Sequence, residues 1–492
     1  MVSQRRPRQI EVLESFNHMK ALANELSPIN CLPPEILSTI PTYWPADSQG
    51  DLIRATHVCS YWRTTLTASP SLWSVVKSGN EAQMRACFYR SQSYPLSLEI
   101  KHPGQEDVVS DAVFFRLKSL TLDLPMINLT RPLGNLVSPT PMLEELNITL
   151  ANSGDYLPVL RTGDFFALSK LHLDSVVPNL LSLHTPNLTT LHFENLQKHP
   201  RMPDLLQFLE RTPRLEQLAL VNTGPEGSRE PPERVVALRS LRVLTLHGTV
   251  AKAKLLQHLD VPASADINLT GSFNFNQRLN GLMEEFLPPC PDNLPVTSNF
   301  TSLTITSTSS SSCDMVFSGN EGKLSITVKD GNGRGVLGHG QSSPPIANLC
   351  LQHFTPLVLD TVTHLTVRCD PWGQQTFPET SAFREFLHQL PSIRFIDLVH
   401  CDSDSIRAFD PVGVNLPFFR SLNIYVAPNA KIDLEDLSHL VKSRSLLQCP
   451  LERVKFVFRS ATRITFTESE MGRLREHVQV VEVDESGISS TC

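Results

Sequence analysis

The chain has 492 residues, is 40% hydrophobic and carries a formal net charge of −7 from 43 basic and 50 acidic residues. A prior of roughly 150 residues per domain predicts about three units, unless a repeat array uses the length as one body. The charges are spread without blocks apart from Arg5, Arg6 and Arg8, which argues against nucleic-acid binding because that needs a basic stripe.

Targeting signals are the next feature to test. The N-terminus MVSQRRPRQIEVLESF lacks the apolar run of about 7 to 15 residues that a secretory signal needs. No stretch approaches the roughly 20 apolar residues of a membrane span. We therefore expect a cytoplasmic and/or nuclear protein with no membrane contact. The ten cysteines show no zinc-ligand spacing, so we expect them to be reduced and expect no metal or cofactor.

The first 27 residues are predicted to form an amphipathic helix. Apolar residues recur at three- and four-residue spacing from Gln9 to Leu26, which is typical of one helical stripe. The stripe consists of Ile10, Leu13, Phe16, Met19, Leu22 and Leu26. It is interpreted as a cover for the next module or as a short coiled pairing; a dedicated partner-binding helix is the other interpretation.

Residues 28–77 are the segment richest in signals. Pro33 and Pro34 suit the first turn of a helix, and Pro41 ends it. A polar loop follows, and Asp51 is predicted to cap a second helix over residues 52–67. Ser69-Pro70 breaks that helix, after which Leu72 and Trp73 fold back.

These residues carry a resemblance to a known family. Leu32-Pro33-Pro34-Glu35-Ile36-Leu37, then Val58-Cys59-x-x-Trp62-Arg63, then Ser69-Pro70-x-Leu72-Trp73 resembles an F-box domain, in particular the F-box-like proteins numerous in mushroom-forming fungi. The resemblance implies a small helical bundle that docks on a Skp-type adaptor of a cullin-RING ubiquitin ligase. The implied adaptor-binding residues are Leu32, Pro33, Pro34, Glu35, Ile36, Leu37, Ile40, Val58, Cys59, Trp62, Leu72 and Trp73.

Two alternatives stay open for this box. Leu32, Ile36, Val58 and Trp62 are also the pattern of a plain bundle core. In addition, family members usually continue the first helix for another turn, whereas here Pro41 ends it and residues 42–50 are polar. This departure shortens the surface that faces an adaptor.

Beyond the box, residues 80–90 are predicted to form a helix capped by Asn80, and LSLEI is predicted to form a strand. A pattern L-x-x-L-x-L then recurs, with its central leucine at positions 120, 146, 171, 191, 218 and 244. These spacings lie in or near the roughly 20–29 residue period of leucine-rich repeats. In that architecture the leucines of each strand point inward and the variable residues outward.

The pattern returns in the C-terminal half. It is found at Phe300/Leu303/Ile305, Ile346/Leu349/Leu351, Val362/Leu365/Val367, Ile393/Ile396/Leu398, Phe419/Leu422/Ile424 and Leu451/Val454/Phe456. MPDLLQFLER and SAFREFLHQL are predicted helices of the convex side. The asparagine that usually follows the last leucine is missing, so irregular repeats are expected.

The predicted fold class is therefore α/β: a small N-terminal helical F-box bundle followed by an irregular leucine-rich-repeat solenoid. The predicted regions are 1–27, the N-terminal helix; 28–77, the box; 78–261, the first repeat region; 262–340, an irregular insertion or long loops; 341–484, the second repeat region; and 485–492, a flexible tail.

The sequence offers only weak matches to motifs for nucleotide binding, metal binding or catalysis. Gly331-Asn332-Gly333-Arg334-Gly335-Val336-Leu337-Gly338 contains G-x-G-x-x-G but leads into Ser-Ser-Pro-Pro, whereas a dinucleotide site needs a helix there. His172, His192 and His247 fall near matching repeat positions, where a metal site is one interpretation and solvated strand residues the preferred one. The sequence contains no nucleophile elbow, P-loop or H-E-x-x-H motif, so no enzyme is expected.

The outward positions of the repeats are the candidates for substrate binding. They are Glu145, Asn147, His172, Asp174, His192, Glu194, His247, Arg368, Asp397 and Tyr425. Their mixed charge favours an unknown protein partner. The predicted function is thus the substrate-recognition subunit of an SCF-type cullin-RING ubiquitin ligase. The alternatives are an interaction scaffold, in which the box only caps the solenoid, and an enzyme that binds a nucleotide at residues 331–340.

Overall fold

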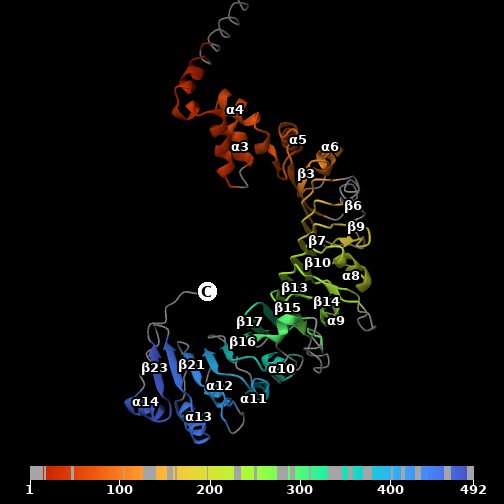
Figure 1. Cartoon of the computed structure of the whole chain (residues 1–492). Helices are drawn as coiled ribbons and strands as arrows, with labels where there is room; N and C mark the ends of the chain where they lie inside the picture. Colours follow the sequence, from red (N-terminus) through yellow and green to blue (C-terminus); the bar gives the residue numbers. More distant parts are fainter. Residues whose placement is uncertain are drawn as a thin grey trace, which may run out of the picture. The chain divides into compact units, whose positions relative to one another are not determined.

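The computed structural model has a mixed α/β architecture, with N-terminal helices and a large, mostly parallel sheet of 17 strands (Figure 1). It describes residues 15, 18–45, 49–102, 105–125, 140–151, 159–160, 163–196, 198–225, 234–248, 252–273, 286–288, 294–309, 312–330, 346–352, 357, 359–369, 379–400, 403–411, 416–426, 434–458 and 467–484. The chain divides into two compact units, Met1–Thr185 and Pro186–Cys492. The division falls inside the predicted region 78–261. The predicted tail and the glycine motif lie outside the described residues.

The first unit begins with a helix whose described part covers residues 18–25. Its apolar residues Met19, Leu22 and Leu26 are exposed. The helix therefore exists in the described part, where the interpretation that the box covers its stripe is wrong for Met19, Leu22 and Leu26; Ile10, Leu13 and Phe16 lie outside the described residues.

The box consists of short helices. They are η1 Pro28–Cys31, α2 Pro34–Thr39, η2 Ile40–Tyr43, α3 Gln49–Ala55, α4 Ser60–Thr67 and η3 Pro70–Trp73. α2 is short, as predicted, but it ends at Thr39, and the chain continues at once as the 3-10 helix η2, which begins at Ile40 and contains Pro41. Pro41 is compatible with this because the first turn of a helix needs no N–H from it.

The predicted second helix, residues 52–67, is two helices. Cys59 has an extended backbone, with φ −155° and ψ 177°, and stands at the N-cap of α4. At the end of α3 the Thr56 hydroxyl donates to the carbonyl of Ile53 at 2.6 Å, so a side chain takes up a carbonyl at the helix end. Asp51 lies in the first turn of α3 and pairs with Arg54 at 2.8 Å, instead of capping the helix.

The core of the box forms around two tryptophans. Trp62 and Trp73 are buried with Leu37, Leu52 and Leu66. Each indole N–H has a partner: Trp73 donates to the carbonyl of Leu66 at 2.8 Å, and Trp62 donates to Oδ1 of Asn30 at 2.7 Å. A buried indole N–H normally needs such a partner, so these bonds fix how the helices meet.

The box leads directly into the sheet. β1 (Val75–Val76) pairs in parallel with β2 (Leu96–Ile100), with Val75 opposite Ser97. Between them lies α5 (Glu81–Arg90), where the Asn80 side chain accepts from the backbone N–H of Gln83. The predicted cap, helix and LSLEI strand are confirmed.

The rest of the first unit's sheet is parallel. The next strands are β3 Leu117–Pro125, β4 Glu145–Ala151 and β7 Lys170–Asp174. Short elements accompany them: η4 Gln105–Val108, α6 Asp111–Phe114, β5 Val159–Leu160 with β8 Val177–Pro178, and β6 Gly163–Asp164 with β9 Leu183–His184. Leu120, Leu146 and Leu171, the predicted repeat leucines, are each buried.

The second unit starts with the parallel strands β10 Thr190–Glu194, β11 Gln217–Val221, β13 Val243–His247 and β15 Asp266–Phe273. Beside them lie α8 Met202–Glu210, which confirms a predicted helix, α9 Lys252–Gln257, and the small pair β12 Val236–Ala237 with β14 Leu259–Asp260.

An antiparallel segment interrupts this order. The strands here are β16 Phe300–Ser309, which follows η7 Pro295–Ser298, β17 Ser312–Gly319 and β18 Lys323–Asp330. β17 runs antiparallel to both β16 and β18, and β18 is parallel to β15. The described part of residues 262–340 is therefore mainly sheet, and the expected long loops are not found there. Its strands alternate buried Cys313, Met315 and Phe317 with polar residues, a two-residue period outside the L-x-x-L-x-L template.

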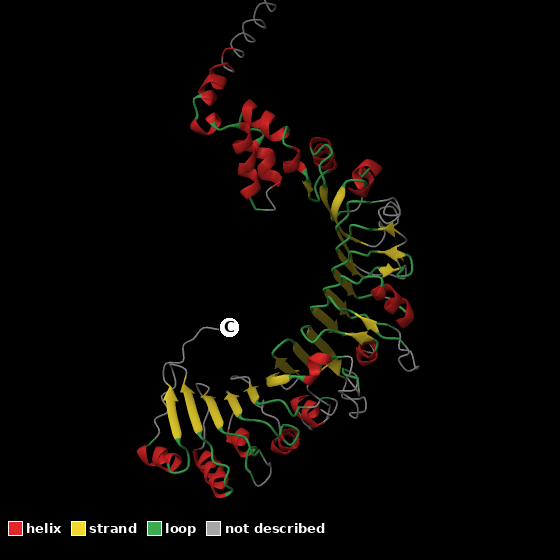
Figure 2. Ribbon diagram, in the orientation of Figure 1, coloured by secondary structure: helices red, strands yellow, loops and turns green. Residues whose placement is uncertain are grey.

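The C-terminal strands are parallel again and follow β16. They are β19 His364–Cys369, β20 Phe395–Val399, β21 Ser421–Val426, β22 Arg453–Phe458 and β23 Val480–Asp484. The helices are α10 Ile346–Gln352, α11 Thr380–Leu387, α12 Ser403–Arg407, α13 Leu434–Leu446 and α14 Glu468–Arg475. In this unit the helices gather on one side of the strands (Figure 2).

One predicted repeat strand is wrong and one convex helix is confirmed. Ile346/Leu349/Leu351 lies in α10; its three-residue first step fits a helix as well as a repeat, and Pro344-Pro345 before it favours a helix start. SAFREFLHQL forms α11, as predicted.

The corners after the strands share a backbone feature. Left-handed φ angles occur at Ser175, Asn195, Asn222, Gly248 and His400. In the second unit the N–H of each such residue donates to the next strand: Asn195 to Val221, Asn222 to His247, Gly248 to Thr270 and His400 to Tyr425. The Asn222 amide also donates to Oδ1 of Asn195 at 2.9 Å. Asparagine and glycine tolerate this conformation. The corners therefore account for Asn195, Asn222 and Gly248, which the leucine pattern does not explain.

Candidate functional site

The predicted adaptor-binding residues divide by exposure. Leu37, Trp62 and Trp73 are buried and serve as the core of the box, so they support the surface from beneath. Leu32, Ile40, Cys59 and Leu72 are half-buried. The exposed members, which we call the box surface, are Pro33, Pro34, Glu35, Ile36 and Val58.

Local backbone geometry brings the apolar members of the box surface into solvent. α2 starts at Pro34 after an extended Pro33, and one turn presents Leu37 inward and Ile36 outward, with Ile36 52% exposed. Val58 precedes the extended Cys59 between α3 and α4 and is 59% exposed. The interpretation of Ile36 and Val58 as core is therefore wrong, because the helix break turns Val58 away from Trp62.

A cavity of about 280 Å³ lies beside the Pro41 break. Its lining comes from η2, α3, η3 and the segment around β1: Pro41, Thr42, Trp44, Pro45, Gln49, Leu52, Ser71, Leu72, Val75 and Lys77. At the point where family members usually continue the first helix of the box, this chain thus has a largely apolar hollow.

In the first unit, the outward positions of β4 and β7 are in register. Asn147 lies opposite His172, and Thr149 opposite Asp174. Glu145 accepts from the Lys170 ammonium at 2.6 Å, and this hydrogen bond raises the pKa of Lys170. The predicted residues of these strands therefore share one face.

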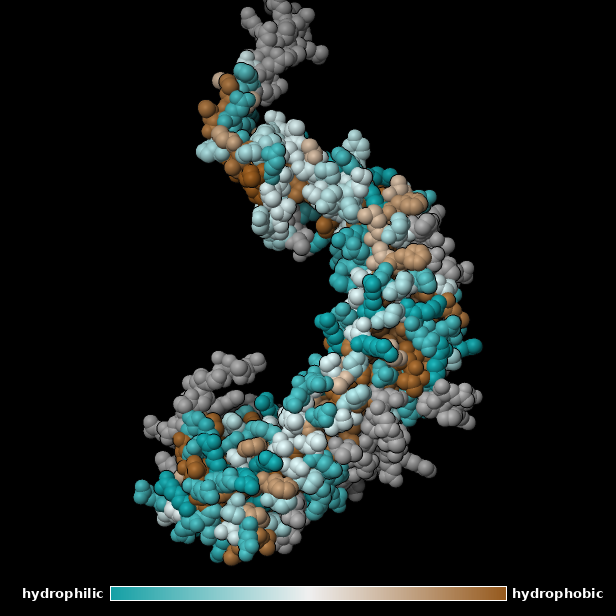
Figure 3. All heavy atoms as spheres, in the orientation of Figure 1, coloured by the Kyte–Doolittle hydropathy of each residue, from teal (hydrophilic) through white to brown (hydrophobic). Residues whose placement is uncertain are grey.

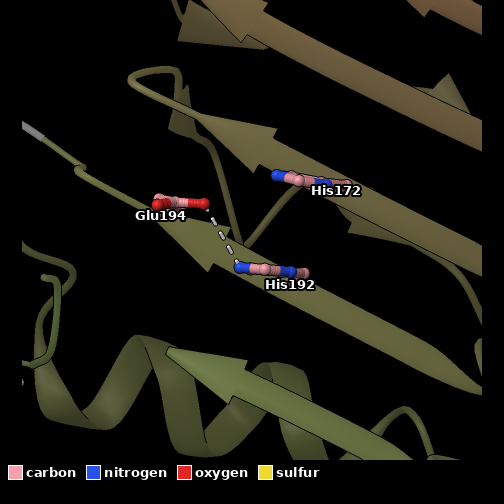
Figure 4. A group of neighbouring side chains, drawn as sticks. All are labelled: His172, His192 and Glu194. Carbon is pink, nitrogen blue, oxygen red and sulfur yellow. Dashed lines mark ion pairs between the residues drawn. The ribbon is translucent and has the colours of Figure 1, made fainter. Parts of the chain in front are cut away.

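In the second unit, His192 and Glu194 are two residues apart on β10 and pair at 3.5 Å between Nε2 and Oε2 (Figure 4). His172, labelled in the same view, belongs to β7 of the first unit. His247 lies in the row of Glu194 through Val221, whereas His192 aligns with Ala219 and Thr245. His192 and His247, predicted to lie near matching positions, are thus offset by two residues in the register.

The C-terminal strands hold a cluster of outward side chains that are connected by hydrogen bonds. Asp397 on β20 accepts from the Asn423 amide of β21 at 2.7 Å, and its second oxygen lies 2.9 Å from Nε2 of His364 on β19. This hydrogen bond raises the pKa of His364. Phe395 lies beside the His364 ring, with 6.0 Å between the ring centroids.

Two further predicted residues border this cluster. Tyr425 is in register with Val399 and Val457, and burial raises the pKa of its hydroxyl. Arg368 lies in register with Val399, in the same row as Tyr425. Next to them, Lys455 pairs with Asp484 at 2.8 Å. We call His364, Phe395, Asp397, Asn423 and Tyr425 the C-terminal face.

His364, Phe395 and Asn423 of this face, and also Lys455 and Asp484, were not among the predicted site residues. The repeat pattern itself contained the information needed to find them. The variable residue between the last two apolar positions of one L-x-x-L-x-L lies opposite the same residue of the next strand, so Asp397 predicts Asn423 beside it.

Comparison with protein families finds the F-box-like family at residues 29–76. The chain thus contains an F-box-like domain, and its bounds agree with the segment whose residues carry the resemblance. A search of curated proteins finds no match to the chain. None of the described helices combines the length and apolar character that spanning a bilayer requires.

Proposed function

We propose that the chain is the substrate-recognition subunit of an SCF-type cullin-RING ubiquitin ligase. The F-box-like domain at residues 29–76 carries this proposal, because F-box domains generally bind Skp-type adaptors of such ligases. In the proposal the chain has no catalytic activity of its own and acts in the cytoplasm or nucleus together with the ligase. The box surface is the docking surface for the adaptor.

We further infer that the sheet is an irregular leucine-rich-repeat solenoid that binds the substrate protein. Its parallel strands with buried leucines, the helices on one side of the second unit and the recurring left-handed corners support this inference. Such repeats present one sheet face to a partner. Neighbouring polar residues there, such as Asp397 with Asn423 and Lys455 with Asp484, carry both charge signs, which favours a protein partner over a phosphate-rich one.

The mechanism of the proposal is proximity. A substrate held on the sheet is kept close to the ubiquitin-loaded enzyme, which raises its effective concentration there. This chain then contributes binding geometry, and its partners contribute the chemistry.

Co-purification of the full chain with a Skp-type adaptor tests the proposal. We expect the wild-type chain to retain the adaptor, and the double variant Ile36→Asp with Val58→Asp to lose it while keeping the tryptophan fluorescence of the folded box. Ala82→Asp with Tyr89→Asp is a matched control, because it adds the same two charges at exposed positions of α5 outside the family match. Failure of the wild-type chain to retain the adaptor would refute the ligase role.

A second function is favoured by a specific observation. β1 is the last element of the box and also pairs with β2 of the sheet, while the Arg90 guanidinium of α5 lies 4.3 Å from the centroid of the Trp73 ring. These contacts are what a cap on a repeat array requires. If adaptor binding fails, a protein-interaction scaffold with the box as its cap is the remaining function.

A further inference from the structure

The helix before the box exposes an apolar stripe that lies mostly outside the family match. Met19, Leu22 and Leu26 are 61%, 48% and 83% exposed, and Ile29 continues them at 44%. The space-filling view shows hydrophobic surface along the end of this helix and over the beginning of the box (Figure 3). A row of such residues on one helix face is a typical sign of a partner surface.

The helix is nevertheless fixed to the box. The Asn30 amide donates to the carbonyl of Asn24 at the end of the helix at 2.7 Å, and Oδ1 of Asn30 accepts from the buried Trp62 indole at 2.7 Å. One side chain therefore joins the helix end to the core of the box. The hydrogen bonds hold the helix in place while its apolar stripe stays open.

Two partners are candidates for covering this stripe: a second copy of the chain and the Skp-type adaptor. A second copy of the chain would need a coiled pairing, but the predicted helix from Gln9 to Leu26 is shorter than the three heptads at which a coiled coil is recognised. A helix that pairs with its own copy also has no need of a bridge to Trp62. By contrast, the stripe continues through Ile29 toward α2, which bears the exposed Ile36.

We propose that residues 18–29 extend the box surface, and that the Skp-type adaptor covers Met19, Leu22, Leu26 and Ile29 together with Ile36. This inference rests on the proposed function, since it names an additional part of the same docking surface. The adaptor segment that binds here is apolar, because the exposed stripe offers dispersion contacts and burial of apolar area rather than charge pairs.

The test measures the affinity of the purified full chain for a Skp-type adaptor by calorimetry. We expect the triple variant Met19→Ser, Leu22→Ser and Leu26→Ser to weaken binding about tenfold or more. The matched control is Lys20→Ser, Ala21→Ser and Asn24→Ser, which places the same number of serines on the opposite face of the helix at exposed positions. It is expected to bind within about twofold of wild type.

The outcomes separate this inference from the proposed function. If the wild-type chain binds no adaptor, both are refuted. If wild type and the stripe variant bind equally well, only the inference is refuted. Sedimentation of the chain alone gives a third outcome: dimerisation that the stripe variant abolishes, with unchanged adaptor affinity, would assign the stripe to a second copy and also overturn the inference.

Asn30→Asp tests whether the bridge positions the helix. The aspartate keeps an acceptor for the Trp62 indole but loses the donor to the Asn24 carbonyl, and it adds a negative charge near the C-terminal end of a helix, where it is unfavourable. We expect the Trp62 fluorescence to stay that of the folded box while adaptor affinity falls several-fold. Unchanged affinity would show that the bridge does not position the stripe.

Discussion

The box surface and the C-terminal face differ in the kind of side chain that they present to solvent. The box leaves Ile36 and Val58 in solvent above a buried core. Apart from the exposed Phe395, the C-terminal face presents polar side chains that are already bonded to one another, with Asp397 accepting from Asn423 and lying 2.9 Å from His364.

This difference sets what a partner gains at each surface. Covering Ile36 or Val58 removes apolar area from water, which is favourable without any specific geometry. A partner at Asp397 must instead replace existing hydrogen bonds, so its gain depends on matching them and is small unless it does. The box is thus suited to one constant partner, and the C-terminal face to discrimination between partners.

The largest effect is expected from a neighbouring pair of substitutions in α2. Leu37→Asp buries a carboxylate in the box core and should destabilise the box by about 4 kcal/mol or more. Ile36→Asp places the same charge in solvent and should leave the fold intact. Tryptophan fluorescence during urea unfolding measures both. Equal losses would mean that Ile36 is core rather than surface, and the contrast between the two regions would fail.

The second largest effect is expected at a corner of the sheet. Gly248 has φ +58°, and a Cβ there would clash with Oδ1 of Asn222. Gly248→Ala should cost about 2 kcal/mol, because an L-residue pays about 1–2 kcal/mol in this conformation in addition to the clash. Thermal unfolding of the full chain measures the loss.

Gly50→Ala is the control for that substitution in the box. Gly50 lies in α3 with nothing within 4 Å of a Cβ, so alanine should stabilise the helix by up to about 1 kcal/mol. Adding Asn222→Gly to Gly248→Ala should restore only part of the stability, since it removes the clash and itself tolerates the left-handed φ of residue 222, but it leaves residue 248 with a strained φ. Full restoration would contradict the role assigned to the left-handed corner.

The smallest effect is expected from pH. The hydrogen bond with Asp397 raises the pKa of His364 above its ordinary 6.5 in the folded chain. Protonated His364 therefore adds stability that is fully present below the pKa of the unfolded state and is lost as pH rises through the raised pKa of the folded state. His364→Gln should lower the unfolding temperature more at pH about 5.5 than at pH about 8.

Asp397→Asn isolates the cause of that shift. Without the carboxylate, the ring of His364 should titrate closer to its ordinary pKa, which NMR of the histidine ring protons measures. An unchanged titration would remove Asp397 as the source of the raised pKa and with it the polar network that distinguishes this face from the box.

The strands with a complete L-x-x-L-x-L were predictable because alternation in burial is a local property of the chain. Leu218 and Leu244 had to be inward once the strand was recognised. β17 was not predictable in this way, because its buried Cys313, Met315 and Phe317 lie among serines that resemble a polar loop. The ambiguity at α10 has the same origin, since a short apolar run fits either kind of element.

The division of α3 and α4 depends on tertiary contacts. The apolar pattern from Leu52 to Leu66 continues through the break, but Arg63 Nε donates to the carbonyl of Thr56 at 3.0 Å, a contact that exists only once the chain has turned. The motif residues of the box could be found in the sequence. Which of them face solvent could not, because the exposed Ile36 and the buried Leu37 are adjacent residues of α2, separated by roughly 100° around the helix axis.

The pairing of β1 with β2 removes any hinge between the box and the first strands of the sheet. The backbone N–H of Ser97 donates to the carbonyl of Ser74 at 2.9 Å, so residue 77, the predicted end of the box, lies inside a hydrogen-bonded unit rather than in a linker. Under the proposed function, a substrate bound on β3 or β4 of the first unit would therefore stay at a constant distance from an adaptor docked on the box. The lysines that receive ubiquitin would then be those whose distance from the bound segment matches this fixed spacing.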